Sequence, residues 1–309
     1  MKKLIATIAV FTVALGAAFA QDLAAVTDLY NAGAEAVSTD KAAALKSFEE
    51  ALKLAEALGD EGQEIVTNCK NIIPNLKMSL AKDLVKESKF DEAVAALAEV
   101  ETVAEAYEAF DVADEAKGLI PQVKMSKANN LYKAKEYDAA AAAFKELLDA
   151  DPANGNAAFY MGAALLGAGK NDEAKAAFEI AAANGQEANA NKQIGNIYLK
   201  EAAAALKDKK YADAVAAAAK VNDYTENAQA WQIAGLASLA AGKNSDAIKY
   251  FEKYLEAAPT ASNAGAIAFT VGALYQGAKN NAKAKEYYTK AASDPKYGAE
   301  AKKMLDALK

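Results

Sequence analysis

Small and large apolar residues recur along the second half of the chain at the spacing of a two-helix repeat of about 34 residues. In three segments a glycine is followed by an alanine and then by an aromatic residue at the same offsets: Gly162, Ala174 and Phe178; Gly235, Ala247 and Phe251; Gly272, Ala284 and Tyr288. No run alternates β-branched and polar residues, as a half-buried strand would. The pattern therefore predicts an all-α chain of helical hairpins.

The segment 228–259 resembles the tetratricopeptide repeat (TPR) family. If residue 228 is position 1, Trp231 stands at position 4, Gly235 at 8, Ala247 at 20, Phe251 at 24 and Pro259 at 32. In that family positions 8 and 20 are small because the two helices approach closely there, and a proline at 32 ends the second helix. The resemblance implies a right-handed α-solenoid of stacked antiparallel helix pairs, a TPR superhelix, in which Trp231 is a packing residue.

The same register extends in both directions and predicts TPR repeats over 121–296. Turn signals agree with it, since Gly169-Lys170-Asn171, Gly242-Lys243-Asn244 and Ala278-Lys279-Asn280 fall between the two helices of their repeats. The predicted repeats are 121–154, 155–188, 188–227, 228–261 and 265–296.

The repeat 188–227 is longer than the others. Ala214 follows Tyr198 by 16 residues, whereas the corresponding pair Tyr275 and Ala284 is nine apart. A surplus of seven residues is about two helical turns. We expect either both helices of this hairpin to be longer by one turn each, or the first helix alone by two.

The two ends of the chain are less regular. Segments 40–51 and 90–97 resemble second helices of a repeat, and 60–87 and 102–118 have about the right length for helices, so 21–120 is predicted to form two longer, diverged TPR-like hairpins. Residues 297–309 place Ala301, Met304, Leu305 and Leu308 on one helix face and lysines on the other. That pattern predicts a C-terminal capping helix.

The first 20 residues have the pattern of a secretory signal peptide. Lys2 and Lys3 precede an apolar run from Leu4 to Leu15, and Ala-Phe-Ala ends at residue 20. The run is shorter than a bilayer requires, which disfavours the alternative of an uncleaved anchor. We expect cleavage after Ala20, export to the periplasm of a Gram-negative bacterium, and no membrane span in the mature chain.

Composition narrows the possible chemistry. The formal charge is −7, and −9 without Lys2 and Lys3, so phosphate backbones and nucleic acid are poor partners. The chain contains no histidine, which removes the commonest general base and transition-metal ligand. Cys69 is the only cysteine, so no internal disulfide can form, and its helical context predicts a buried, unreactive thiol.

Acidic pairs such as Glu49-Glu50 and Asp91-Glu92 are better explained by solvated helix faces and first turns than by a carboxylate dyad. Asp60, Glu61 and Glu64 lack the spacing of a calcium loop, and no phosphate-loop, nucleophile-elbow or zinc-protease motif occurs. We therefore expect no catalytic, cofactor or metal site, and no enzymatic activity.

In the TPR family the first helix of each repeat lines a concave groove, chiefly at positions 2, 5, 9, 12 and 13. Carried over to this sequence, these positions combine amides, lysines and isolated apolar groups. Amides can hydrogen-bond the backbone of an extended peptide, and phenylalanines can seat apolar side chains. The candidate partner-binding residues are Asn129, Tyr132, Asn156, Phe159, Lys192, Asn196, Gln232, Leu236, Phe269 and Gln276.

Lys192 and Asn196 stand where chaperone-binding TPR domains begin a clamp for a C-terminal carboxylate. Ile233 and Thr270 occupy later clamp positions, so that clamp is not expected here.

Together these features predict a non-catalytic periplasmic scaffold that binds a protein or peptide through its concave groove. One alternative is a structural subunit of a cell-envelope or secretion complex that docks by its convex face or its ends. Another is binding of a glycan or small ligand in the groove. The sequence leaves the partner and the oligomeric state open.

Overall fold

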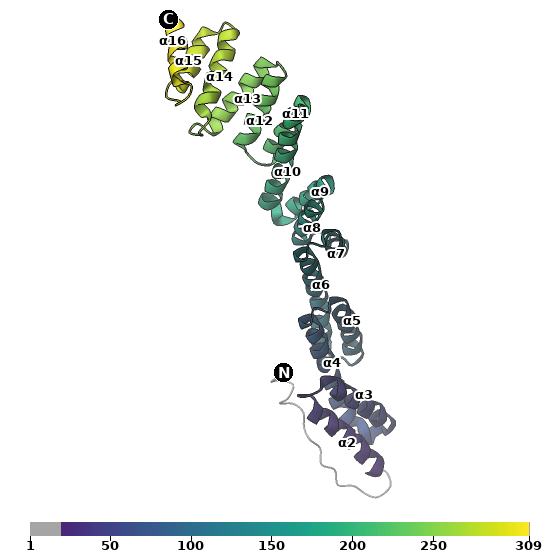
Figure 1. Ribbon diagram of the computed structural model, residues 1–309. Coiled ribbons are helices and arrows are strands. Elements are labelled where there is room, and N and C mark those ends of the chain that lie inside the picture. Colours follow the sequence, from purple (N-terminus) through teal and green to yellow (C-terminus); the bar gives the residue numbers. More distant parts are fainter. Residues whose placement is uncertain (1–19, 309) are drawn as a thin grey trace. The chain divides into compact units, whose positions relative to one another are not determined.

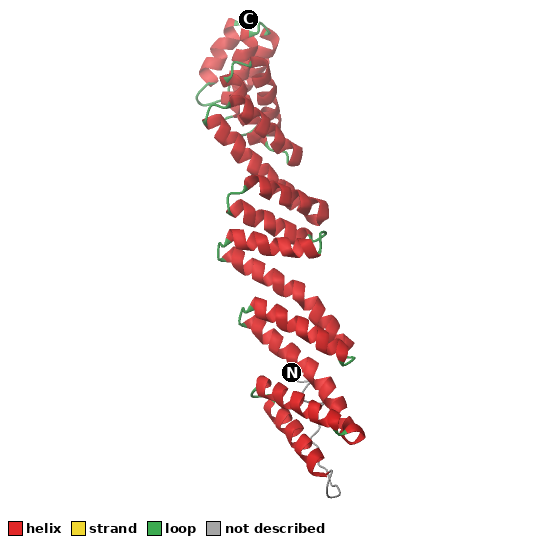
Figure 2. Cartoon of the chain, turned by 90° about the vertical axis from the view of Figure 1, so that its right-hand side faces the viewer, coloured by secondary structure: helices red, strands yellow, loops and turns green. Residues whose placement is uncertain are grey.

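The computed structural model describes residues 20–308, and every regular element in that range is helical (Figure 2). Residues 1–19, which hold all but the last residue of the predicted signal peptide, lie outside the described part, as does residue 309. The chain divides into two compact units, Met1–Asp151 and Pro152–Lys309.

The N-terminal unit contains three helix pairs in which consecutive helices pack side by side (Figures 1 and 2). A short 3₁₀ turn, η1 (Gly59–Gly62), follows the first pair. The helices are α2 (Ala20–Ala36), α3 (Lys41–Ala57), α4 (Gln63–Lys86), α5 (Phe90–Ala106), α6 (Phe110–Lys133) and α7 (Tyr137–Ala150).

The C-terminal unit continues the same arrangement and ends in an unpaired helix that packs on α15. A kinked turn, η2 (Ala182–Gln186), in which Asn184 and Gly185 have non-helical backbone angles, precedes its second pair. The helices are α8 (Gly155–Gly167), α9 (Asn171–Ala181), α10 (Glu187–Lys207), α11 (Tyr211–Tyr224), α12 (Ala228–Ala240), α13 (Asn244–Ala257), α14 (Ala264–Gly277), α15 (Asn281–Ala291) and α16 (Gly298–Ala307).

Most pairs are closed by the same tight turn. One residue with positive φ follows the first helix, and the next amide reaches back to a carbonyl in the last turn of that helix, as Lys170 N does to Leu165 O. Glycine fills this left-handed position at Gly169 and Gly242, but Lys135, Lys209 and Lys279 adopt it elsewhere. The predicted turn signals thus mark real turns, each set by a C-terminal helix cap.

The glycine of each regular repeat lies against the aromatic ring of the second helix. A Cβ on Gly162 would stand 2.8 Å from the Phe178 ring, and one on Gly235 would stand 2.5 Å from Phe251. The sequence argument attributed this small residue to close approach of the two helices alone. The structure gives the specific reason, which is that the ring at position 24 occupies the space a Cβ at position 8 would need.

The same contact occurs in the first pair, where Gly33 lies under the ring of Phe48 and Tyr30 packs edge-on against that ring at 5.4 Å. The α2/α3 pair therefore uses the packing of the C-terminal repeats. The sequence could have predicted this packing, because Gly33, Ala44 and Phe48 have nearly the same spacing as the glycine, alanine and aromatic residue of a regular repeat.

Two predicted boundaries in the N-terminal third are wrong. The expected helix over 102–118 is interrupted at 107–109, where Glu108 has a φ of 58°. The boundary at residue 120 falls inside α6, and Pro121 lies within that helix instead of at the start of a repeat. The exposed Pro121 is tolerated because the carbonyl that loses its helical donor can bind water.

The long hairpin of the C-terminal unit is extended in its first helix alone. Helix α10 has 21 residues, whereas α8 and α12 have 13 each. Helix α11 has 14, the same as α13. The second of the two alternatives from the sequence is therefore the correct one.

Helix α16 covers the last pair. Ala301 is buried, and Met304, Leu305 and Leu308 pack against the core formed by α13, α14 and α15. Its lysines face outward, with Lys302 and Lys303 exposed. This amphipathic helix shields the last apolar face of the unit.

Candidate functional site

The ten candidate residues are divided between the two units. Asn129 and Tyr132 lie on α6 in the N-terminal unit, and the others lie on α8, α10, α12 and α14, the first helices of their pairs.

Asn156 belongs to a chain of side-chain amides near η2. Gln186 Nε2 donates to Asn156 Oδ1 at 2.7 Å, and Asn189 Nδ2 donates to Gln186 Oε1 at 3.0 Å. Gly185, with a φ of 87°, brings Gln186 to this position. Sequence reasoning missed Gln186 because the change of direction after α9 was not expected.

The aromatic candidates are half-buried and used in packing. Phe159 lies 5.4 Å from the Phe178 ring, and Phe269 lies 5.4 Å from Tyr288 and 5.3 Å from Tyr297. Tyr132 meets Tyr137 edge-on at 5.7 Å. Only part of each ring remains available to a partner.

Gln276 is also engaged, because its Oε1 accepts a hydrogen bond from the Tyr288 hydroxyl at 2.7 Å. Lys192 and Asn196 are exposed on α10, and within residues 20–308 neither forms a side-chain hydrogen bond or ion pair. Leu236 is 39% exposed, and Gln232 is half-buried. The candidates thus all lie on first helices of their pairs, but no contact among the described residues joins them into one site.

Trp231 packs as expected. Its ring stacks on Tyr250 at 6.0 Å, and Lys253 Nζ lies 4.2 Å from the ring centroid. Both partners are on α13, so Trp231 holds the α12/α13 pair together.

A groove of about 790 Å³ lies in the N-terminal unit between α4 and α6, the first helices of two consecutive pairs. We call it the α4–α6 groove. The turn before α6 and the start of α3 complete it. Its lining is Lys41, Asn68, Asn71, Ile72, Asn75, Met78, Ser79, Lys82, Lys86, Glu108, Ala109, Phe110, Asp111, Val112 and Glu115.

A row of amides runs along the α4 side of this groove. Asn68, Asn71 and Asn75 are three and four residues apart, so they lie on one helix face. Asn75 Nδ2 donates to the Asn71 carbonyl at 2.9 Å, which leaves its Oδ1 free to accept. Within the described residues, the side-chain amides of Asn68 and Asn71 have no partner.

The lining of the groove contains three lysines and three carboxylates, and each lysine is paired. Lys82 Nζ lies 2.5 Å from Glu115 Oε1 across the groove. Lys86 and Lys41 both bind the Asp83 carboxylate, Lys86 at 2.6 Å. Hydrogen bonds from these two lysines, that from Lys41 first, lower the pKa of Asp83.

Phe110 stands where the groove meets the α5–α6 turn. It is 61% exposed, the highest value among the exposed large apolar side chains of the described residues. Ile72 and Met78 lie buried in the α4 wall. Sequence reasoning passed over this site because it lies outside the clear repeat register, although the amide spacing on one helix was visible.

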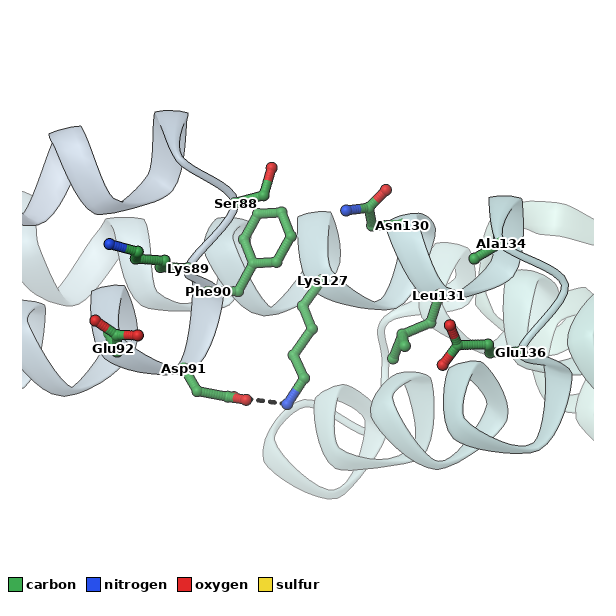
Figure 3. Close-up of a pocket in the computed structure, with 10 residues that line it drawn as sticks. All are labelled: Ser88, Lys89, Phe90, Asp91, Glu92, Lys127, Asn130, Leu131, Ala134 and Glu136. Carbon is green, nitrogen blue, oxygen red and sulfur yellow. Dashed lines mark hydrogen bonds and ion pairs between the residues drawn. The ribbon is translucent and has the colours of Figure 1, made fainter.

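A smaller cavity of about 370 Å³ lies between the start of α5 and the end of α6 (Figure 3). Phe90 projects into it opposite Asn130, and Lys127 Nζ binds Asp91 Oδ1 at 2.6 Å below the ring (Figure 3). Half of its lining is charged: Lys89, Asp91, Glu92, Lys127 and Glu136.

A third hollow, of about 760 Å³, lies in the C-terminal unit between α13 and α15. Glu252 on its wall accepts hydrogen bonds from the Tyr275 and Tyr287 hydroxyls at 2.7 and 2.9 Å. Burial, and then the hydrogen bond to Glu252, raise the pKa of Tyr275 to about 12. These bonds join three helices, so the cluster has a structural explanation.

The described residues gather no group of histidine, cysteine, aspartate or glutamate side chains able to hold a metal ion. Cys69 is fully buried, and burial raises the pKa of its thiol to about 12, which suppresses the reactive thiolate. No helix between residues 20 and 308 is both long enough and apolar enough to cross a bilayer.

Comparison with known proteins finds a match of residues 131–192 to the tetratricopeptide repeat family model. No curated protein matches the chain. Among solved structures, MamA is 20% identical over 59% of this chain and 96% of its own, with a TM-score of 0.35. YrrB, a TPR protein with an unusual peptide-binding site, is 22% identical over 59% and 91%, with a TM-score of 0.32.

A third solved structure is the C-terminal part of a TPR repeat-containing protein from Cytophaga hutchinsonii. It is 18% identical over 74% of this chain and 99% of its own, with a TM-score of 0.32. The family match covers α7, α8 and α9 in full and parts of α6 and α10. The glycine–aromatic contact of α8/α9 recurs in α2/α3, α12/α13 and α14/α15. Residues 131–192 thus match a tetratricopeptide repeat, and the described chain around them is an all-α series of packed helix pairs.

Proposed function

We propose that this protein is a non-catalytic, exported scaffold that binds a protein or peptide partner along the first helices of its repeats. The observation that carries the proposal is the α4–α6 groove. It lies between the first helices of consecutive pairs, and it presents unpartnered amides beside an exposed phenylalanine. Such a surface suits recognition of a polypeptide by its backbone and one anchor side chain.

The chemistry of the groove supports binding over catalysis. Its lysines are held by carboxylates, and no histidine exists in the chain to act as a general base. Cys69, the one thiol, is buried. None of these groups is poised as a nucleophile or proton carrier.

Export is part of the proposal and is supported by the N-terminal sequence pattern. We expect the mature protein to begin at Gln21 and to reside in the periplasm. Intact-mass analysis of the protein purified from a periplasmic fraction tests this directly. Retention of residues 1–20 on a protein recovered with the membranes would contradict it.

Capture from the native envelope tests the scaffold function. The tagged full chain is purified at low and high salt, and bound proteins are identified by mass spectrometry. We expect one or a few partners whose recovery falls in a Phe110→Ala variant but is unchanged in Asn130→Ala, which alters the smaller cavity. A large complex that survives high salt and both substitutions would instead indicate a permanent envelope subunit.

A further inference from the structure

We propose that mature copies of this chain associate head to tail, with an acidic edge of the N-terminal unit of one copy docking on a lysine-rich edge of the C-terminal unit of the next. The inference goes beyond the proposed scaffold function, because the partner is a second copy and the docking surfaces are turns at the ends of helices. The difference in charge between the two units carries it.

The two units differ sharply in charge. Residues 21–151 contain 14 lysines and 26 aspartates or glutamates, a formal charge of −12. Residues 152–309 contain 19 lysines and 16 aspartates or glutamates, a formal charge of +3. Two copies that meet through their N-terminal units repel each other, whereas the N-terminal unit of one copy attracts the C-terminal unit of another.

Much of the negative charge of the N-terminal unit lies at one edge, formed by the α3–α4 turn and the α5–α6 turn. Lys70 connects the two turns, since its Nζ lies 3.0 Å from Glu56 near the end of α3 and 5.6 Å from the ring centroid of Tyr107 after α5. Six carboxylates of these turns and the adjoining helix ends are exposed and, within residues 20–308, have no ion-pair partner: Asp60, Glu61, Glu105, Glu108, Asp111 and Asp114. We call this set the acidic edge.

The C-terminal unit presents lysines at the turns inside its last three helix pairs. They are Lys207, Lys209 and Lys210 at the α10–α11 turn, Lys243 at the α12–α13 turn and Lys279 at the α14–α15 turn. All five are exposed, and in the described part of the chain none has an ion-pair partner. Asp208 is the one carboxylate in these turns. Because consecutive pairs pack on one another, the turns lie along one edge of the unit, which we call the lysine edge.

Phe110 gives the acidic edge a second feature that favours lysine. Its side chain is 61% exposed, and Glu108 and Asp111 flank it in the chain. A lysine that binds a carboxylate here can also cover the ring, with its ammonium group over the face or with its methylene stem. Exposed ion pairs contribute little singly, so several of them act together with this ring.

Such an interface joins two different patches, so every assembly keeps one acidic edge and one lysine edge free. Further copies can therefore add at both ends. An assembly of this kind multiplies the partner sites of the scaffold, which raises its avidity for a partner that is itself repeated.

Sedimentation of the purified mature chain tests the inference in the absence of any other protein. At about 0.01 M salt, where charges interact over about 30 Å, we expect the weight-average mass to rise with protein concentration beyond that of a dimer. At about 1 M salt, where that distance is about 3 Å, the chain should be a monomer. A chain that stays monomeric at low salt and high concentration would overturn the inference.

Charge reversal at each edge identifies the two surfaces. Glu105→Lys/Glu108→Lys and Lys209→Glu/Lys210→Glu should each abolish self-association at low salt. An equimolar mixture of these two variants should form a dimer with one copy of each and nothing larger, because each variant keeps one intact edge. If the mixture also stayed monomeric, the two edges would not be each other's partners.

The reversals suit the local backbone, because Glu108, Lys135 and Lys209 all adopt the same left-handed conformation, with φ of 58°, 63° and 61°. Glu50→Lys/Glu146→Lys is the matched control, since it changes the charge of the N-terminal unit equally at exposed positions on α3 and α7. This control should associate as the native chain does. Circular dichroism and a thermal melt of every variant confirm that the fold is retained.

Two further results would contradict the proposed edges. One is association that persists in both edge variants, and the other is a control reversal that abolishes association as fully as the edge reversals do. Neither result bears on the capture of a different protein from the envelope, so the scaffold function is tested separately.

Discussion

At the scale of single residues, contacts between a glycine and an aromatic ring set the packing of the repeats. Gly162, Gly235 and Gly272 each lie so close to a ring that a Cβ would overlap it. Gly118 differs, since it is an exposed glycine within α6 and a Cβ there would meet nothing within 4 Å. Identical substitutions at the two kinds of site should therefore act in opposite directions.

Gly235→Ala should lower the free energy of unfolding by about 1–3 kcal/mol, because the Phe251 ring must move out of its place. Gly118→Ala should raise it by about 0.5–1 kcal/mol, because alanine restricts the unfolded chain and no contact opposes it. Urea denaturation followed by circular dichroism measures both. Equal effects of the same sign would show that the ring contact has no energetic role.

Cys69 provides a test of burial that depends on pH. Burial raises the pKa of its thiol to about 12, above the value of about 8.5 in an unfolded chain. The buried thiol contributes fully to the free energy of unfolding below the pKa that it has in the unfolded chain. That contribution is lost as pH rises from there toward the pKa of the thiol in the folded chain. At pH 8 we expect a thiol reagent to modify Cys69 only after denaturant is added; rapid modification of the native protein would contradict this.

At the scale of elements, the regular repeats were predictable because each helix pair carries its own glycine, alanine and aromatic signals. The extension of α10 was visible as a seven-residue surplus, but its assignment to one helix needed the structure. The helix over 110–133 was not foreseen, because the 34-residue register placed the start of a repeat at residue 121. Tertiary packing of α6 between α5 and α7 outweighs the helix-breaking preference of Pro121.

We therefore expect the free energy of unfolding to be lower with Pro121 than with alanine at the same position. Its ring removes one backbone hydrogen bond from the middle of α6, while its own side chain is exposed and packs little. Pro121→Ala should raise the free energy of unfolding by about 1–2 kcal/mol, after allowance for the greater freedom of the unfolded chain. A fall in the urea midpoint would instead mean that Pro121 makes a required contact.

At the scale of the molecule, the all-α fold of successive helix pairs was accessible from sequence, and the α4–α6 groove was not. A groove depends on which side chains two separate helices bring together. Asn71 on α4 and Phe110 on α6 belong to pairs without the clear register of 228–259. The ten residues predicted from that register remain candidates, and several of them, such as Phe269 and Gln276, already have intramolecular partners.

Site-specific photo-crosslinking in cells tests the central claim most directly. A photoreactive amino acid at Lys86, on the rim of the α4–α6 groove, leaves the asparagine row intact, and one at Asn130 serves as the control. After irradiation, mass spectrometry identifies the crosslinked segment. The account predicts an adduct from position 86, absent at 130, with a segment of a protein partner. Adducts that form only from positions 192 or 269, or none at position 86, would contradict it.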